Sequence, residues 1–279
     1  MGRTSTVAFA GGLAILALVA GAAAVQETSC SEVDSPEAEV GSVLLQQRSE
    51  RGKAIMERVE VAPFSFKACA AEFIAMTLFV VIGCGSACGI AKEAGSAWVL
   101  QVALTFGFAI TVLAYTIGHY SGGQINCAVT FGLMLVGEVS VVQGLCNILA
   151  QMLGSVFGAL ILTVMYPKGK DLTGGLGSNG IGEGWKVESA LAGETAMTFL
   201  LMYTVLETAV NPATQATRSL ACIAIGLAVF LAHSVLIPID GCSINPTRSF
   251  GPALVAKLCY EDAATFKDMW VFWAGPLVG

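Results

Sequence analysis

Long apolar runs alternate with short polar segments along this chain, and the length of each run decides what it can form. A helix needs about 20 apolar residues to cross the hydrocarbon core of a bilayer. Five runs reach that length, at about 68–90, 97–118, 141–166, 189–210 and 219–239. The pattern therefore predicts five transmembrane helices.

Two further apolar runs are too short to cross a bilayer. They begin at Cys127 and Pro246, directly after Asn126 and Asn245, and each follows a segment that contains glycine. At about 1.5 Å per residue, each run gives a helix of roughly 15 Å, half the thickness of the hydrocarbon core. We predict two half-helices that enter from opposite faces and meet at their Asn ends, so that together they make one crossing.

The two half-helix segments belong to an internal repeat. Aligned on their Asn residues, both carry Gly four places before, Ile one place before, and Phe-Gly five and six places after. Each repeat contains three spans and one half-helix, at about 66–166 and about 188–279. An odd number of spans inverts the second repeat relative to the first. The predicted fold is an all-α membrane protein built as an inverted repeat.

The sequence also predicts the nature of the two ends of the chain. Residues 1–25 resemble a signal peptide or an anchor helix, residues 26–65 read as a polar tail, and residues 66–279 form the membrane domain. Basic residues of the tail favour a cytoplasmic side, whereas a cleaved signal would leave the new N-terminus outside, so both orientations stay open. The last apolar run starts near Met269 and stops at Gly279, and we expect a sixth span that is truncated here.

The composition agrees with a membrane protein and excludes other classes. Hydrophobic residues make up 55% of the chain and charged residues 12%, against about a quarter in soluble domains. The net charge of -6 gives no support for a nucleic-acid partner. Nine Cys and two His show no metal-ligand spacing, and no nucleophile-base-acid set suggests an enzyme. We expect no cofactor and no metal.

The half-helix ends carry the candidate chemistry. Irregular backbone at membrane depth must be buried in protein or line a watery cavity. Asn126 and Asn245 fit helix N-caps whose side-chain oxygen accepts from the first turn, which leaves each amide NH2 as a donor toward a passage. Both positive dipole ends would point at the same midpoint and repel cations. Two Asn residues that cap ordinary buried turns are the alternative.

Three charged residues within the apolar segments need an explanation. Arg248 lies in the first turn of a half-helix, where a cation is unfavourable, and Val129 stands at the matching place. This suggests a function, with snorkelling to the interface as the alternative. Glu72 and Glu194 occupy corresponding places in the two repeats and must be paired in lipid. We expect them to brace the loops, and a proton relay is the alternative.

Two long motifs and a third, shorter one identify a family resemblance. They are Gly118-His119-Tyr120-Ser121-Gly122 leading into Asn126-Cys127-Ala128, Asn245-Pro246-Thr247-Arg248-Ser249-Phe250-Gly251, and Trp270-Val271-Phe272-Trp273 with Gly275-Pro276. Over about residues 66–279 the chain resembles an aquaporin of the major intrinsic protein family, of the water-selective type. The resemblance implies six spans and two half-helices around a pore in each subunit, and a homotetramer in the membrane.

The resemblance also implies roles for individual residues. The narrowest ring of the pore would consist of Phe106, His233, Cys242 and Arg248. The pore centre would consist of Asn126, Cys127, Ala128, Asn245, Pro246 and Thr247. Glu72, Glu194 and His119 would brace the loops, and Ser249, Ala253, Phe272 and Trp273 stand at positions that distinguish water from glycerol channels. Asp at the place of Ser249 is typical of glycerol-conducting relatives, so this chain carries the water-type choice.

Two positions depart from the family pattern. Cys127 stands where the family has Pro, and Thr247 stands where it has Ala. Losing a compatible Pro costs only about 0.4–1 kcal/mol, so the first half-helix should form. We hypothesise that the smaller Cys127 and the larger Thr247 compensate each other in packing.

These observations predict a passive water channel that conducts in single file and excludes ions. Its partners would be water or small neutral solutes and membrane lipid, in a plasma membrane or an internal membrane reached through the secretory pathway. Three alternatives stay open. In the first, the pore also passes hydrogen peroxide, ammonia or glycerol. In the second, the protein is a secondary transporter, which would show saturable uptake coupled to an ion gradient. In the third, the chain as given, with its short sixth span, does not conduct.

Overall fold

The computed structural model describes Gln46, residues 64–261 and residues 263–279. The signal-like segment 1–25 and nearly all of the polar tail lie outside the described residues. The described helices are α3 (Phe66–Ile90), α4 (Trp98–Ser121), α5 (Cys127–Leu135), α6 (Val141–Met165), α7 (Val187–Val205), α8 (Ala221–Asp240), α9 (Pro246–Cys259) and α10 (Val271–Val278). Within the described ranges no strand occurs.

The five predicted transmembrane helices are confirmed. Among the described residues, five helices are long and apolar enough to cross a membrane, and they match the predicted runs apart from their ends. The fourth continues from α7 into a π-helical turn, Leu206–Val210, and a 3-10 segment, Pro212–Leu220, leads into α8. Local chemistry sets other boundaries. The Ser65 side chain accepts from the Ala68 N–H and starts α3, and Gly122, with φ of 88°, ends α4.

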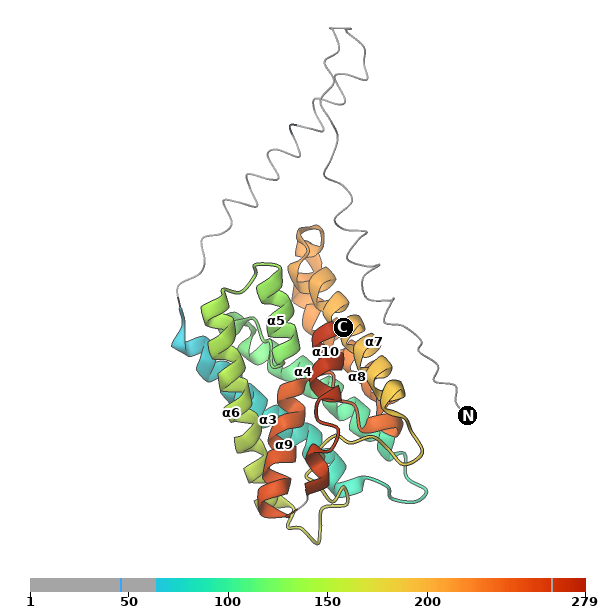
Figure 1. The fold of residues 1–279 in the computed structure, drawn as a ribbon. Helices are drawn as coiled ribbons and strands as arrows, with labels where there is room; N and C mark the ends of the chain where they lie inside the picture. Colours follow the sequence, from blue (N-terminus) through green and yellow to red (C-terminus); the bar gives the residue numbers. More distant parts are fainter. Residues whose placement is uncertain (1–45, 47–63, 262) are drawn as a thin grey trace, which may run out of the picture. The chain divides into compact units, whose positions relative to one another are not determined.

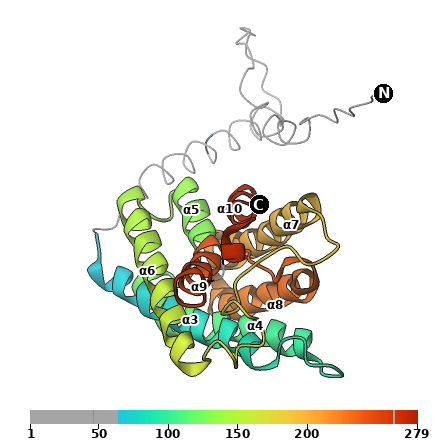
Figure 2. The ribbon, with the colours of Figure 1, turned by 60° about the horizontal axis from the view of Figure 1, so that its bottom comes forward.

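The helices of the two inverted repeats pack in the same way. In the first repeat α3 packs against α4 and α6; in the second, α7 packs against α8 and α10. The long contact between α4 and α8 joins the repeats. In Figure 1, α5 lies in the upper part of the described helices and α9 lies in the lower part. Figure 2 shows α9 surrounded by the longer helices. The predicted entry of the half-helices from opposite sides is confirmed.

Glycines bring α6 against the backbone of α3. A Cβ on Gly154 would lie 2.4 Å from the Phe73 carbonyl oxygen, and a Cβ on Gly158 would lie 2.6 Å from the Thr77 carbonyl oxygen. Any side chain at either place would push the helices apart, because both obstacles are backbone atoms. Small residues allow such close approach in lipid, where packing rather than water expulsion holds helices together.

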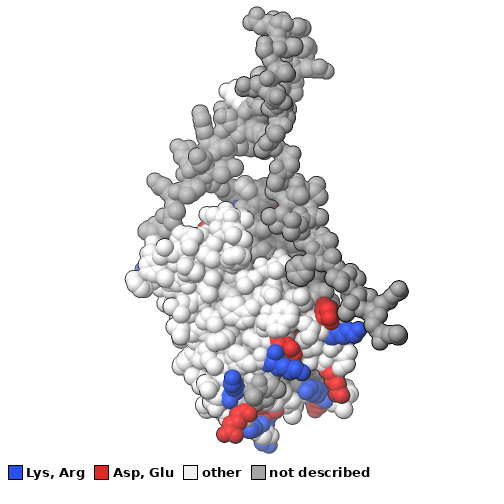
Figure 3. Space-filling view, viewed as in Figure 1, with Lys and Arg blue, Asp and Glu red and all other residues white. Residues whose placement is uncertain are grey.

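The outer surface has the distribution of a membrane-embedded protein. On the face shown in Figure 3, the charged side chains gather at the lower end, and the middle of the face carries none among the described residues. Large apolar side chains are exposed on the outer faces of the helices, among them Phe108, Val112, Leu149 and Val164. Water would make such a surface unstable, whereas lipid tails cover it at no cost. The protein is an integral, multi-pass membrane protein.

Candidate functional site: a pore through the joined half-helices

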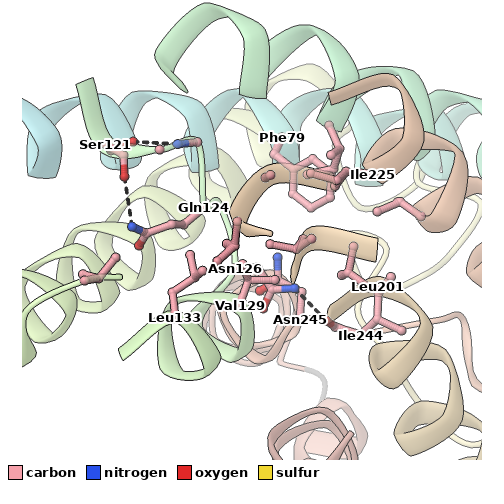
Figure 4. A pocket seen from close by; sticks show the side chains of 18 of the residues that line it. Phe79, Ser121, Gln124, Asn126, Val129, Leu133, Leu201, Ile225, Ile244 and Asn245 are labelled. Carbon is pink, nitrogen blue, oxygen red and sulfur yellow. Dashed lines mark hydrogen bonds between the residues drawn. The ribbon is translucent and has the colours of Figure 1, made fainter. Parts of the chain in front are cut away.

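The tips of the two half-helices bond to each other. We call residues 122–126 the first pore loop and residues 241–245 the second pore loop. Asn126 Nδ2 donates to the Ile244 carbonyl at 2.7 Å, and Asn245 Nδ2 donates to the Ile125 carbonyl at 2.8 Å. Figure 4 shows the two Asn side chains close together. Each Asn therefore fixes the loop of the other repeat.

Each Asn also caps its own half-helix, as the sequence predicted. Asn126 Oδ1 accepts from the Ala128 N–H at 2.9 Å, and Asn245 Oδ1 accepts from the Arg248 N–H at 3.2 Å. The amide groups differ from the expectation in one respect. One hydrogen of each NH2 goes to the opposite loop instead of the passage, because the loops meet closely enough to exchange hydrogen bonds. The second hydrogen is the donor that each Asn can offer to a solute.

The residues before the two Asn have an unusual backbone that makes this exchange possible. Ile125 has φ of 50° and Ile244 has φ of 45°, a left-handed conformation that is rare for β-branched residues. Such strain costs about 1–3 kcal/mol per residue and persists only where the surroundings enforce it. The Ile125 N–H donates to Glu72 Oε2 at 2.7 Å and the Ile244 N–H donates to Glu194 Oε2 at 2.6 Å. The two carboxylates thus hold the strained backbone.

The two carboxylates lie where the sequence placed them, and both are fully buried. Glu72 accepts four hydrogen bonds, from the Ser121 hydroxyl, the Gln124 N–H, the Ile125 N–H and the Gln151 amide. Glu194 accepts two, from the Ser243 and Ile244 N–H groups, each at 2.6 Å. These are the contacts that a brace needs.

The third residue expected to brace a loop lies elsewhere. His119 is exposed, and its ring lies against Tyr120, with centroids 3.8 Å apart. Within the described part of the chain no hydrogen bond joins it to a pore loop. Its place at the last turn of α4 turns the side chain outward, so the structure offers no support for a bracing role.

Three of the four residues expected in the narrowest ring lie together. The rings of Phe106 and His233 stack, with centroids 4.2 Å apart and planes 21° apart. The Arg248 guanidinium carbon lies 5.0 Å from the centroid of the Phe106 ring, within cation–π distance. Gly83 makes room for Phe106, because a Cβ there would lie 2.3 Å from the ring. We call the Phe106–His233 pair the ring stack.

The side chain of the fourth residue, Cys242, does not line a cavity. Its side chain is fully buried and its backbone has φ of 54°. It lines neither of the two cavities described next. With the rings in this arrangement, the thiol is therefore closed off.

Two cavities lie on either side of the ring stack. The first, of about 350 Å³, contains Asn126, Asn245 and His233 in a mainly apolar wall and is drawn in Figure 4. The second, of about 730 Å³, contains Phe106 and Arg248 and opens among polar loop residues. The described residues that line one cavity do not line the other. His233 of the ring stack lines the first cavity and Phe106 of the same stack lines the second.

Free polar atoms face this constriction. His233 Nδ1 lies 2.9 Å from the Val229 carbonyl and must donate to it, because a carbonyl can only accept. This leaves Nε2 without a partner among the described residues, and in a neutral ring this nitrogen is an acceptor. Arg248 Nε is also unpaired. A water could donate to Nε2, and a water could accept from Nε.

The sequence did not single out the residue that orients Arg248. Arg248 Nη1 donates to Asn179 Oδ1 at 2.7 Å and to the Gly177 carbonyl at 2.8 Å. Asn179 Oδ1 also accepts from the Ser249 hydroxyl at 2.8 Å. Asn179 lies in the glycine-rich loop between the two repeats. Nothing in its sequence context indicated that it folds back into the membrane domain.

The two departures from the family pattern touch each other. The Cys127 thiol lies in hydrogen-bond contact with the backbone and the hydroxyl of Thr247. The Thr247 hydroxyl donates to Asn245 Oδ1 at 2.5 Å, a bond without a counterpart at Asn126. Both side chains are buried behind the loop tips and line neither cavity. The expected contact is present, and its energetic compensation stays a hypothesis.

The remaining expected positions are buried or half-buried, and most of them belong to the second repeat. Ala128 and Pro246 are buried at the start of the half-helices. Ser249, Ala253 and Phe272 are buried and Trp273 is half-buried. Ser249 has a local role, because its hydroxyl lies 2.6 Å from that of Ser243 and thereby ties α9 to the second pore loop.

Comparisons with known proteins agree on one family. The family model described as Major intrinsic protein matches residues 59–279. The chain is 38% identical to Aquaporin PIP2-7 of Arabidopsis thaliana over 233 residues, covering 81% of each chain. It is 40% identical to an Aquaporin PIP-type of Atriplex canescens over 228 residues, covering 79% of each. The X-ray structure of the aquaglyceroporin from Plasmodium falciparum has the same fold, with a TM-score of 0.69 and 19% identity, over 76% of this chain and 91% of that chain.

Proposed function

The chain belongs to the major intrinsic protein family, and on that premise we propose that it is a passive transmembrane water channel that conducts water in single file and excludes ions. Members of this family are channels rather than enzymes. The relatives with 38–40% identity over about four fifths of the chain are named aquaporins. We propose that the protein assembles as a homotetramer, as is typical of the family.

The observation that carries the proposal is the reciprocal bonding of Asn126 and Asn245. It places two half-helix N-termini at one point, and both positive dipole ends act there. Each Asn retains one amide hydrogen at the wall of the 350 Å³ cavity. A water there accepts hydrogen bonds through its oxygen, while a cation is repelled by dipoles and donors alike. We therefore expect water to pass through this arrangement passively, without coupling to a chemical reaction.

We propose that Phe106, His233, Cys242 and Arg248 form the selectivity filter. The stacked rings leave little width, and a solute must pass at the place where His233 Nε2 and Arg248 Nε lack partners. Water can replace the missing hydrogen bonds, because it can donate to Nε2 and accept from Nε. A larger polyol would need more room than the rings give. The filter would therefore favour water.

The proposal is tested by osmotic swelling of vesicles that contain the purified protein, followed by stopped-flow light scattering. Water, glycerol and hydrogen peroxide are compared in the same preparation, with protein-free vesicles as the control. We expect water permeability well above the control and glycerol permeability equal to it. Equal acceleration of water and glycerol would contradict the narrow filter, and no acceleration of any solute would contradict the channel.

A further inference from the structure

The two repeats carry different residues at one aligned position beside the pore loops. When the pore loops are aligned on their Asn residues, Ser121 in the first repeat matches Asp240 in the second. Ser121 makes two hydrogen bonds. Its hydroxyl donates to Glu72 Oε1 at 2.5 Å and accepts from the Gly123 N–H at 3.1 Å. It thus links the brace to the first pore loop.

Asp240 reproduces the accepting half of this arrangement. Asp240 Oδ1 accepts from the Cys242 N–H at 2.9 Å, and Cys242 matches Gly123. The other oxygen, Oδ2, is buried without a hydrogen-bond partner, in a residue that is only 1% exposed. The carboxyl lies within hydrogen-bond reach of the Glu194 carboxyl, the counterpart of Glu72. What is missing is a hydrogen between them.

We propose that Asp240 and Glu194 form a proton-binding site, in which one shared proton lets Asp240 Oδ2 donate to Glu194 as Ser121 donates to Glu72. Without that proton, two buried carboxylates would lie side by side and repel each other. With it, every oxygen of the pair has a hydrogen-bond role. Asp240 lines the 730 Å³ cavity, so the proton can exchange with solvent there.

The neighbouring groups supply no other donor for Asp240 Oδ2. Arg248 on α9 acts on both carboxyls through its charge, but its Nη1 is directed to Gly177 and Asn179. The Cys242 thiol of the second pore loop lies beside the pair. From α10, Gly275 packs against Glu194. Lys92 and Glu183 line the same cavity, and no hydrogen bond joins either to Asp240 among the described residues.

The shared proton couples the second pore loop to pH. Asp240 bonds the backbone of Cys242, and Glu194 bonds the backbone of Ser243 and Ile244. Removing the proton places two negative charges against each other beneath the loop that leads to Arg248. A folded state that holds one proton more than the unfolded chain loses stability as the pH rises, about tenfold in the unfolding equilibrium per pH unit. The first pore loop has no matching pair of carboxyls, because Ser121 stands in the place of Asp240.

The direct test is infrared spectroscopy of the purified protein, which detects the C=O stretch of a protonated carboxyl and does not depend on water conduction. We compare the parent with Asp240→Ser and Asp240→Asn, neutral side chains that can donate to Glu194. Glu183→Gln is the matched control, since it removes an exposed carboxylate of the same cavity. The parent and the control should show the band at neutral pH, and both Asp240 variants should lack it. An unchanged band in Asp240→Asn, or no band in the parent, would overturn the proposal.

The second measurement is the thermal midpoint of the protein in detergent as a function of pH. The midpoint of the parent and of Glu183→Gln should fall between neutral and alkaline pH, and that of Asp240→Ser should fall less over the same range. Parallel curves for the parent and Asp240→Ser would overturn the proposal. Because neither readout uses permeability, failure here is distinguishable from failure of the proposed water channel.

Discussion

Phe106 and His233 lie face to face, with ring centroids 4.2 Å apart, at the boundary between the two cavities. Phe106 comes from α4 of the first repeat and His233 from α8 of the second. The constriction therefore lies between the two repeats, and the contact of α4 with α8 sets its width. A small change in the position of either ring would change the opening.

Shortening one member of the ring stack should widen the solute range. His233→Ala removes the ring that faces Phe106, so glycerol permeability should rise several-fold while water permeability changes less, because pore width limits the larger solute. Stopped-flow swelling of vesicles measures both. Phe108→Ala, on the outward face of α4, is the control and should change neither. A filter elsewhere would be indicated if His233→Ala left glycerol excluded.

Asn179 should act through Arg248. Asn179→Leu removes the acceptor of Arg248 Nη1 and of the Ser249 hydroxyl. A hydrogen bond to a charged group is worth about 1.5–3 kcal/mol, so the thermal midpoint should fall and glycerol should begin to leak. Asn179→Asp keeps an acceptor at the same place and should retain glycerol exclusion. Equal behaviour of the two variants would show that the contact does not orient Arg248.

Much of the fold could be predicted from the sequence, because a lipid bilayer restricts the length and the polarity of the segments that cross it. The five long runs, the two short ones and the inverted repeat follow from length and register alone. Glu72 and Glu194 were found because a carboxylate within an apolar run needs partners. The hydrogen bonds from each Asn side chain to the opposite pore loop could not be predicted, since they depend on the positive φ of Ile125 and Ile244.

The missed residues share a physical reason. Asn179 acts from a loop whose path across the protein is set by tertiary contacts, and no periodicity marks it. Asp240 at the end of α8 looks like a polar helix terminus until its carboxyl is placed beside Glu194. The bracing role of His119 stays a prediction from the motif, and its ring is exposed in the last turn of α4.

Cys127 and Thr247 should behave as a pair. Cys127→Pro enlarges a buried side chain that contacts Thr247, and overpacking typically costs about 1–3 kcal/mol. The yield of monodisperse protein in detergent should fall. Adding Thr247→Ala should recover part of it by making room, although it also removes the bond to Asn245 Oδ1. The compensation hypothesis fails if the double variant is no better folded than Cys127→Pro.

Cys242 should be the target of mercurial block. The thiol is fully buried and lines neither cavity, so a mercurial reaches it only when the surrounding side chains move apart, and reaction there would obstruct the proposed filter. Water permeability of the parent should fall with mercury and that of Cys242→Ser should not. Cys127→Ser and Cys259→Ser are controls that should remain sensitive. Persistent block in Cys242→Ser would remove Cys242 from the filter.

The central claim is that two half-helix tips, joined through Asn126 and Asn245, pass water and repel protons. It is tested most directly by recording water flux and proton flux in the same vesicles, one by light scattering and the other by an enclosed pH-sensitive dye. We predict water flux far above that of protein-free vesicles, with a lower activation energy, and proton flux equal to that of the lipid alone. Proton flux that rises together with water flux, or water flux no faster than through lipid, would contradict the account.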